Sequence, residues 1–301
     1  MFARLAERPS DHTCSGISSL LDIGGRRSII AVMSEYSPFQ DMMFDLLQSA
    51  MELAREPVVE AEVERKPDTT YVCSTDKAIQ ARMVSDIRRN HPDHAVIAEE
   101  SDEGDFARPQ EARYCWVIDP LDGTRNYVGG LPCFSTAIAL LDRGMPVLAA
   151  VGEPNVNRIF IAEKGRGTRR DRIPVRVRDP HLDRTALIGL TTNRDPLSLQ
   201  FLERWARVGG FILRNLGSTA YHMALVSDGS LHGCASRKCK IWDIAAGALL
   251  IEEAGGVVTH EDGRPLIPFD LGIDPEQNIP VIAGAPGTHE RLIRLRQADA
   301  D

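Results

Sequence analysis

The chain has 301 residues, of which 43% are hydrophobic and 26% charged, so it can bury a large core as one α/β unit or as two lobes. Its formal net charge is −8, which disfavours nucleic-acid binding because a phosphate backbone requires clustered Lys and Arg. No stretch approaches the roughly 20 consecutive apolar residues that cross a bilayer, and no signal-like run opens the sequence, so we expect no membrane contact and a cytoplasmic location.

The chain begins with a segment that lacks sustained apolar periodicity. We interpret residues 1–35 as an N-terminal extension compatible with disorder, and Met33 offers a second possible start. From Pro38 onward, apolar residues recur at spacings of three and four. This spacing predicts an amphipathic helix of about 17 residues that follows Ser37 as its N-cap and ends near Pro57.

Two short strands flank a second predicted helix. The β-prone stretch Tyr71–Cys73 precedes Asp76, where a helix begins that stops before Pro92. The apolar run Ala95–Ala98 then predicts a strand, and two glutamates, of which Glu99 is the first, follow it directly.

A longer strand also ends in acidic residues. The stretch Tyr114–Ile118 predicts a strand that ends at Asp119-Pro120. After it, Ser135–Leu141 and Val147–Val151 are typical of paired strands around Gly144. Acidic residues therefore stand at the ends of strands, where ligands are often bound.

The second half of the chain is more helical. Three helices are predicted, over residues 199–208, 220–226 and 243–254, and Ser218 and Thr219 are cap candidates for the second. We expect a metal-binding half over residues 36–165 and a C-terminal half over residues 166–301 that completes the site.

A basic segment and the cysteines could each form another kind of site. Residues 164–178 alternate Val and Ile with Arg, which favours a strand with a solvated basic face, and a nucleic-acid-binding strip is the alternative. The cysteines form no C-x-x-C pair, which favours reduced, mostly buried thiols over a zinc site. They are Cys14, Cys73, Cys115, Cys133, Cys234 and Cys239.

The most informative segment is Trp116–Thr124, WVIDPLDGT. Proline after Asp119 fixes φ and predicts a sharp turn that brings Asp119 and Asp122 together. Two close carboxylates repel each other unless a cation neutralises them, and hard oxygen ligands suit Mg²⁺. The following Gly123-Thr124 offers backbone N–H groups to phosphate oxygens.

One acid stands alone in an apolar run. Asp243 lies within IWDIAAG, residues 241–247. A buried, uncompensated aspartate is costly, so Asp243 must cap the helix, pair with a base or bind a metal.

Three segments in the same order resemble the signatures of the inositol monophosphatase family. They are AEES at 98–101, WVIDPLDGT at 116–124, and WDIAAG at 242–247 continuing to EAGG at 253–256. The resemblance extends from about Pro38 to the C-terminus. It implies an α/β fold of layered αβαβα type, a homodimer, and hydrolysis of a small phosphate monoester by water activated by two or three Mg²⁺ ions.

The resemblance also implies roles for individual residues. The metal ligands would be Glu99, Asp119, the carbonyl of Leu121, Asp122 and Asp243. Asp76 and Thr124, with Glu99, would orient and activate the water. Phosphate and substrate contacts would come from Gly123, Thr124, Ser218, Thr219 and Asp243.

Substrate choice is left open by the residues near Asp243. Ser236 stands where inositol-specific members commonly carry a glutamate, and Arg237, Lys238 and Lys240 follow it. If the basic side chains face the site, they favour a second anionic group on the substrate; the alternative is that they face solvent. We rank inositol or sugar monophosphates first, histidinol phosphate second, and fructose 1,6-bisphosphate or 3′-phosphoadenosine 5′-phosphate third, with an inactive metal-binding scaffold as the non-enzyme alternative.

Overall fold

The computed structural model describes residues 34–56, 63–65, 71–101, 109–178, 185–191 and 196–297. The N-terminal extension expected over residues 1–35 lies almost entirely outside the described residues. The fold described below belongs to the unit formed by residues 35–301.

The larger sheet has seven strands in the order β3-β4-β5-β6-β7-β8-β9. β3 is parallel to β4, and every other neighbouring pair is antiparallel. The strands are β3 Ala95–Ala98, β4 Tyr114–Asp122, β5 Ser135–Asp142, β6 Met145–Glu153, β7 Arg158–Glu163, β8 Gly167–Arg170 and β9 Ile173–Val175. The short helices α3 Thr124–Val128 and η2 Pro154–Val156 lie in its connections.

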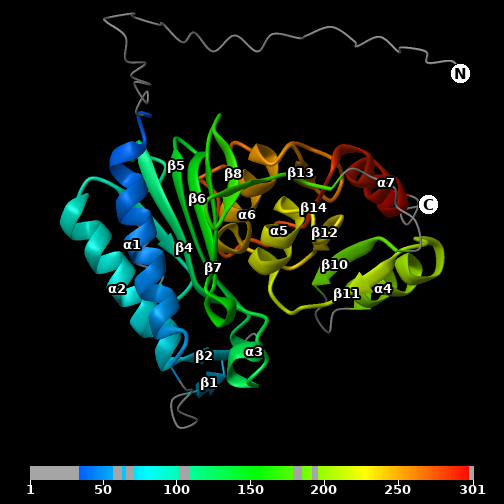
Figure 1. Ribbon diagram of the computed structural model, residues 1–301, viewed down its shortest axis with the longest axis horizontal. Coiled ribbons are helices and arrows are strands. Elements are labelled where there is room, and N and C mark those ends of the chain that lie inside the picture. The colour runs from blue at the N-terminus through cyan, green and yellow to red at the C-terminus, as the bar shows by residue number, and fades with distance from the viewer. Residues whose placement is uncertain are drawn as a thin grey trace, which may run out of the picture. The chain divides into compact units, whose positions relative to one another are not determined.

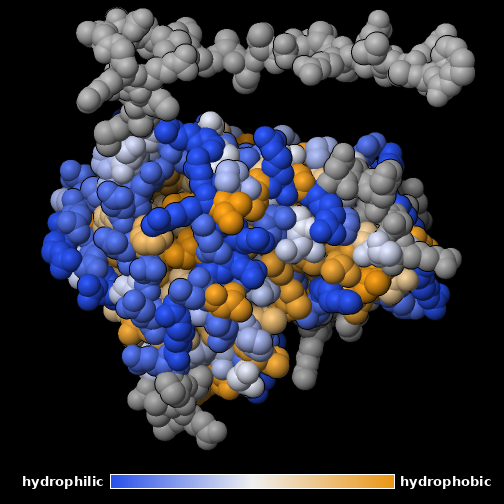
Figure 2. Space-filling view, viewed as in Figure 1, coloured by the Kyte–Doolittle hydropathy of each residue, from blue (hydrophilic) through white to orange (hydrophobic). Residues whose placement is uncertain are grey.

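Alternation along β4 explains why both faces of this sheet are covered. Trp116 and Ile118 pack with the helices α1 Ser37–Leu53 and α2 Ser74–Asn90. Cys115 and Val117 pack on the opposite face with α5 Thr219–Ser227 and α6 Ile241–Glu253. The outer surface over α1 and α2 is mostly hydrophilic (Figure 2), as expected for amphipathic helices.

The second sheet has five strands in the order β11-β10-β12-β14-β13. β10 is parallel to both of its neighbours, and β14 is antiparallel to β12 and β13. The strands are β10 Leu187–Thr191, β11 Ile212–Arg214, β12 Gly233–Ser236, β13 Val257–His260 and β14 Val281–Gly284. A separate ribbon pairs β1 Val63–Arg65 with β2 Tyr71–Cys73.

The layers follow from three hydrophobic clusters. α5 and α6 lie between the two sheets (Figure 1). On the outer face of the five-stranded sheet, Trp205 and Leu292 pack on Ile188 and Ile282, and they belong to α4 Pro196–Val208 and α7 Pro286–Gln297. The predicted αβαβα sandwich is therefore confirmed. None of the described helices is both long and apolar enough to cross a membrane.

Most predicted elements are present where the periodicity placed them, but α1 and β4 differ in detail. Ser37, which we predicted as the N-cap of the first helix, is its first helical residue, and Tyr36 is the N-cap. The strand does not end at Asp119; it continues through Pro120 to Asp122. The boundary that we predicted after residue 165 lies between β7 and β8, which pair in one sheet, and the division into halves stays a prediction.

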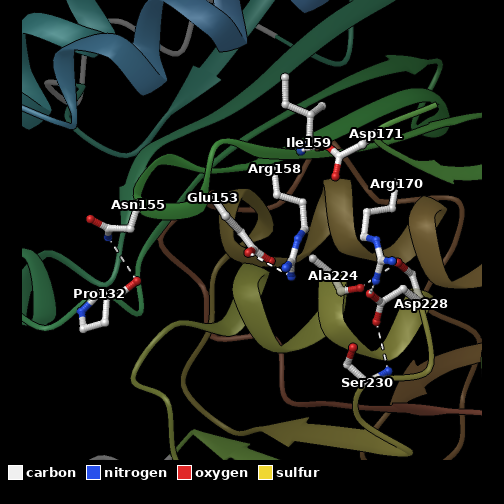
Figure 3. Close-up of polar contacts among 11 residues, drawn as sticks. Pro132, Glu153, Asn155, Arg158, Ile159, Arg170, Asp171, Ala224, Asp228 and Ser230 are labelled. Atoms are coloured by element: carbon white, nitrogen blue, oxygen red, sulfur yellow. Dashed lines mark hydrogen bonds and ion pairs between the residues drawn. The ribbon is translucent and has the colours of Figure 1, made fainter. Parts of the chain in front are cut away.

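Two ion pairs lie along β6, β7 and β8: one joins β6 to β7, and the other joins β8 to the residue that follows α5 (Figure 3). Arg158 lies 3.3 Å from Glu153, and Arg170 lies 2.5 Å from Asp228, which follows α5. The Glu153 side chain is only 2% exposed, and neither of its oxygens has a hydrogen-bond partner in the described segments. Burial raises the pKa of Glu153 to about 7, although Arg158 opposes the shift.

This buried carboxyl predicts a pH-dependent stability. Between the ordinary pKa of 4.5 and about 7 the folded chain holds a proton at Glu153 that the unfolded chain releases. The stability that this group contributes therefore falls as pH rises through that window and is lowest above it. Glu153→Gln should raise the melting temperature relative to wild type more at pH 8 than at pH 5. The exposed control Glu203→Gln should show no such difference, and an equal effect of Glu153→Gln at both pH values would contradict the assignment.

Candidate metal centre

A β-bulge brings Asp119 and Asp122 to the same side of β4. Three residues apart in a regular strand, they would point to opposite faces of the sheet. Here Asp119 pairs with Ala137 and Asp122 pairs with Ser135, so two residues of β4 oppose one of β5. The bulge, rather than the predicted turn after the strand, is what places both carboxylates together.

Asp243 joins this pair from a different layer. One carboxylate oxygen each of Asp119, Asp122 and Asp243 lies within 4.8 Å of the other two. Asp243 stands in the first turn of α6, where the N–H of Lys240 donates to its Oδ2 at 2.6 Å. Asp243 thus takes part in capping α6 and also faces the other two acids.

Asp122 is held by the start of α5. Its Oδ2 accepts a bond from Ser218 Oγ at 2.7 Å and another from the Ala220 N–H at 2.6 Å. These donors oppose the effect of burial, which raises the pKa of Asp122 to about 6. Ser218, which we predicted to contact phosphate, therefore binds an acid of the cluster directly.

Asp119 is the least compensated acid. It is fully buried, its Oδ1 accepts from the Leu121 N–H at 3.0 Å, and its Oδ2 has no hydrogen-bond partner among the residues that the structure describes. Burial first, then the charges of Glu99 and Asp122, raise its pKa well above the ordinary value. Burial and the charge of Asp122 likewise raise the pKa of Asp243 to about 8. Converging oxygens with an orphaned buried atom among them fit a hard divalent cation, so this triad could hold a metal ion.

Asp76 lies in a second, connected group. It is fully buried in the first turn of α2 and its Oδ2 accepts from Cys73, from the N–H at 2.7 Å and from the thiol at 2.8 Å. Thr124 Oγ1 lies 3.2 Å from Asp76 Oδ1 and 3.1 Å from the carbonyl oxygen of Leu121. The predicted water-activating pair is therefore in contact, and it adjoins the predicted carbonyl ligand.

Gly123 and Glu99 complete the predicted set. Gly123 has φ +97°, and a Cβ there would lie 3.2 Å from the carbonyl oxygen of Cys133, so the position needs glycine. Glu99 follows β3, its N–H donates to the Ile118 carbonyl at 3.3 Å, and its charge raises the pKa of Asp119. Glu99 is near the cluster but outside the group of three that converges within 4.8 Å.

The predicted substrate contacts divide into two groups. Ser236 Oγ lies 3.2 Å from Thr219 Oγ1, beside the donors to Asp122. Arg237 and Lys240 instead lie 3.4 Å from the carboxylates of Glu261 and Glu276, respectively. An anion at the site would have to compete with those carboxylates. Lys238, the third basic residue, is exposed.

Four polar residues near the site were not singled out from the sequence as functional. They are Cys73, Ser135, Thr191 and His222. The spacing of Cys73 and Asp76 matches a capping box, which could have indicated the first. Ser135 pairs with Asp122 only because of the bulge, and its Oγ lies 3.2 Å from Ser218 Oγ. No local sequence pattern indicates a role for Thr191 or His222.

The fold and this acidic site agree with the comparisons to known proteins. A family model described as the inositol monophosphatase family matches residues 35–300. The chain therefore belongs to the inositol monophosphatase family, whose members are metal-dependent and bind phosphorylated small molecules.

Individual relatives bear different names. The chain is 35% identical over 206 residues to the Nus factor SuhB of Pasteurella multocida, covering 66% of this chain and 74% of that protein. It is 32% identical over 248 residues to the chloroplastic phosphatase IMPL1 of Arabidopsis thaliana, covering 77% of this chain and 66% of that protein. The solved inositol monophosphatase from Anabaena superposes with a TM-score of 0.74 at 28% identity, covering 88% and 97% of the two chains.

The close approach of three acids predicts that the side chains that bind metal lower the stability of the metal-free protein. Asp119→Asn should raise the melting temperature of the metal-free protein, because one buried like charge is removed. The same variant should lose the increase in melting temperature that Mg²⁺ gives to the wild type. Thermal unfolding in EDTA and at saturating Mg²⁺ measures both effects. The exposed control Asp262→Asn should respond like wild type, and a full Mg²⁺ response in Asp119→Asn would show that the site lies elsewhere.

Proposed function

We propose that this protein is a Mg²⁺-dependent phosphatase that hydrolyses a small phosphate monoester. The observation that carries the proposal is the fully buried side chain of Asp119: one of its oxygens lies within 4.8 Å of an oxygen of Asp122 and one of Asp243, and its Oδ2 has no hydrogen-bond partner among the described residues. Family membership and the names of two relatives, a phosphatase and an inositol monophosphatase, support the same activity.

Five residues would hold two or three Mg²⁺ ions in this proposal. They are Asp119, Asp122, Asp243, Glu99 and the carbonyl oxygen of Leu121. Bound Mg²⁺ would supply Lewis acidity, which lowers the pKa of a water and neutralises charge on the phosphate.

The chain itself supplies a proton acceptor. Thr124 can donate its hydroxyl hydrogen to Asp76 Oδ1 at 3.2 Å, which leaves the lone pairs of Oγ1 free to accept a hydrogen from an attacking water. The bonds from Cys73 hold the other oxygen of Asp76 in place. In this proposal Asp76 receives the proton and Thr124 aligns the water.

In this proposal backbone dipoles also help to bind the phosphate group. Asp76 and Asp243 lie in the first turns of α2 and α6, and the first turn of α5 donates to Asp122, so the positive ends of three helices would lie beside the acidic groups. The N–H groups of Gly123 and Thr124, and the start of α5 at Ser218 and Thr219, would receive phosphate oxygens.

The surrounding side chains favour a polyol or sugar monophosphate over a bisphosphate. The hydroxyls of Thr219 and Ser236 suit the hydroxyl groups of a neutral leaving group. Arg237 and Lys240, on which the bisphosphate alternative rests, are ion-paired with Glu261 and Glu276. Histidinol phosphate stays the second candidate.

Three further predictions concern nucleic-acid binding, oligomeric state and location. The name Nus factor SuhB belongs to several relatives, and our expectation that this chain binds no nucleic acid stays a prediction. The expected homodimer and cytoplasmic location also stay predictions.

A substrate panel tests the proposal. At saturating Mg²⁺ we expect faster phosphate release from inositol 1-phosphate than from histidinol phosphate or fructose 1,6-bisphosphate. Asp76→Asn should lower kcat by about 100-fold or more, the range for loss of a general base, and Asp243→Asn should abolish turnover. An enzyme silent on inositol 1-phosphate and fast on histidinol phosphate would reverse the ranking. Mg²⁺ binding by calorimetry without phosphate release from any monoester would instead identify an inactive scaffold.

A further inference from the structure

A row of three hydroxyl groups runs along the carboxyl ends of two parallel strands. Thr191 ends β10 and Ser236 ends β12, and the two are paired in register. Thr219, the first residue of α5, lies between them, with its Oγ1 at 3.3 Å from Thr191 Oγ1 and 3.2 Å from Ser236 Oγ. The row adjoins the candidate metal centre, because the residues on either side of Thr219 both donate to Asp122. Carboxyl ends of parallel strands are a common place for ligands in α/β sheets.

His222 closes one end of this row. Its Nδ1 lies 3.2 Å from Thr191 Oγ1, and its Nε2 lies 3.0 Å from the backbone nitrogen of Leu216. The side chain is 1% exposed. Gly189 makes room for the ring, since a Cβ there would lie 3.0 Å from its Cγ and Cδ2. The imidazole is therefore held by packing and by hydrogen bonds at both nitrogens.

The contact with Leu216 determines which ring nitrogen carries the proton. A backbone N–H can only donate, so Nε2 must be the acceptor and must lack a hydrogen. Burial lowers the pKa of His222 to about 4, so the ring is neutral near pH 7. The remaining proton is then on Nδ1, which donates to Thr191 Oγ1.

This donor orients the hydroxyls in sequence. Thr191, having accepted from His222, donates its own hydrogen to Thr219 Oγ1, and Thr219 in turn donates to Ser236 Oγ. The hydrogen of Ser236 is left to be donated outside the row. Each hydroxyl of the row therefore donates in a fixed direction. A hydroxyl group of the substrate would then meet hydrogen-bond partners that are already oriented and do not rotate freely.

We propose that His222 is a positioning residue that orients the hydroxyl row Thr191, Thr219 and Ser236 and so confers selectivity for phosphate esters of polyols. This inference rests on the proposed phosphatase function and refines its substrate class. His222 acts through the row and does not itself touch the substrate. A substrate whose leaving group has no hydroxyls gains nothing from the row.

The test compares two substrates that share the phosphate but differ in the leaving group. kcat/KM is measured for inositol 1-phosphate and for p-nitrophenyl phosphate at saturating Mg²⁺. In His222→Asn and in Thr191→Val the ratio of the two values should fall about tenfold, the size expected for one or two lost oriented hydrogen bonds. In the double variant this ratio should fall no further than in either single variant, because both substitutions break the same row of hydrogen bonds.

Further measurements separate this role from a purely structural one. Nitrogen-15 NMR of the wild-type imidazoles should show His222 with its proton on Nδ1. His232→Asn is the matched control, because this second buried histidine accepts from the Leu187 N–H at 3.2 Å; it should lower stability without changing the ratio. If His222→Asn does not fold, Thr191→Val alone carries the comparison.

Four results would overturn the inference. Equal losses on both substrates, which leave the ratio unchanged, would show a structural role only, and no loss on either substrate would show that the row does not contact the leaving group. If the effects of the two substitutions on the ratio multiply in the double variant, the two residues act separately. If the wild-type enzyme hydrolyses neither substrate, the proposed function is wrong, and this inference fails with it. If the enzyme hydrolyses p-nitrophenyl phosphate but the variants leave the ratio unchanged, only the inference is wrong.

Discussion

The structure depends on the burial of like charges at one point. Asp119, Asp122 and Asp243 bring carboxylate oxygens within 4.8 Å of one another, and within the described part of the chain one oxygen of Asp119 has no hydrogen-bond partner. Desolvation and mutual repulsion both disfavour this arrangement. The chain compensates in part with donors at the starts of α5 and α6, and a bound cation would supply the rest.

The layers explain how acids distant in sequence meet. The bulge in β4 presents Asp119 and Asp122 from the seven-stranded sheet, and α6, packed against that sheet, presents Asp243. α5 touches both sheets, so its first turn can contact Asp122 on one side and the hydroxyl row on the other. The helix layer between the sheets thus connects the metal centre to the proposed substrate contacts.

Much of the fold and the acidic set could be predicted from the sequence, since they rest on local patterns. Helical spacing located α1, α2 and α6, and acids at strand ends indicated the site. The bulge could not be predicted, because it depends on how β4 pairs with β5 and not on Pro120 alone. The ion pairs of Arg237 and Lys240, and the link from His222 to Thr191, depend on packing between distant segments.

The most direct test of the account is to locate a cation in crystals grown with Mn²⁺, a scatterer with oxygen-ligand preferences close to those of Mg²⁺. Anomalous diffraction should show a peak enclosed by the side chains of Asp119, Asp122 and Asp243. Strong peaks elsewhere with none among these three acids would contradict the central claim that a divalent cation compensates their burial.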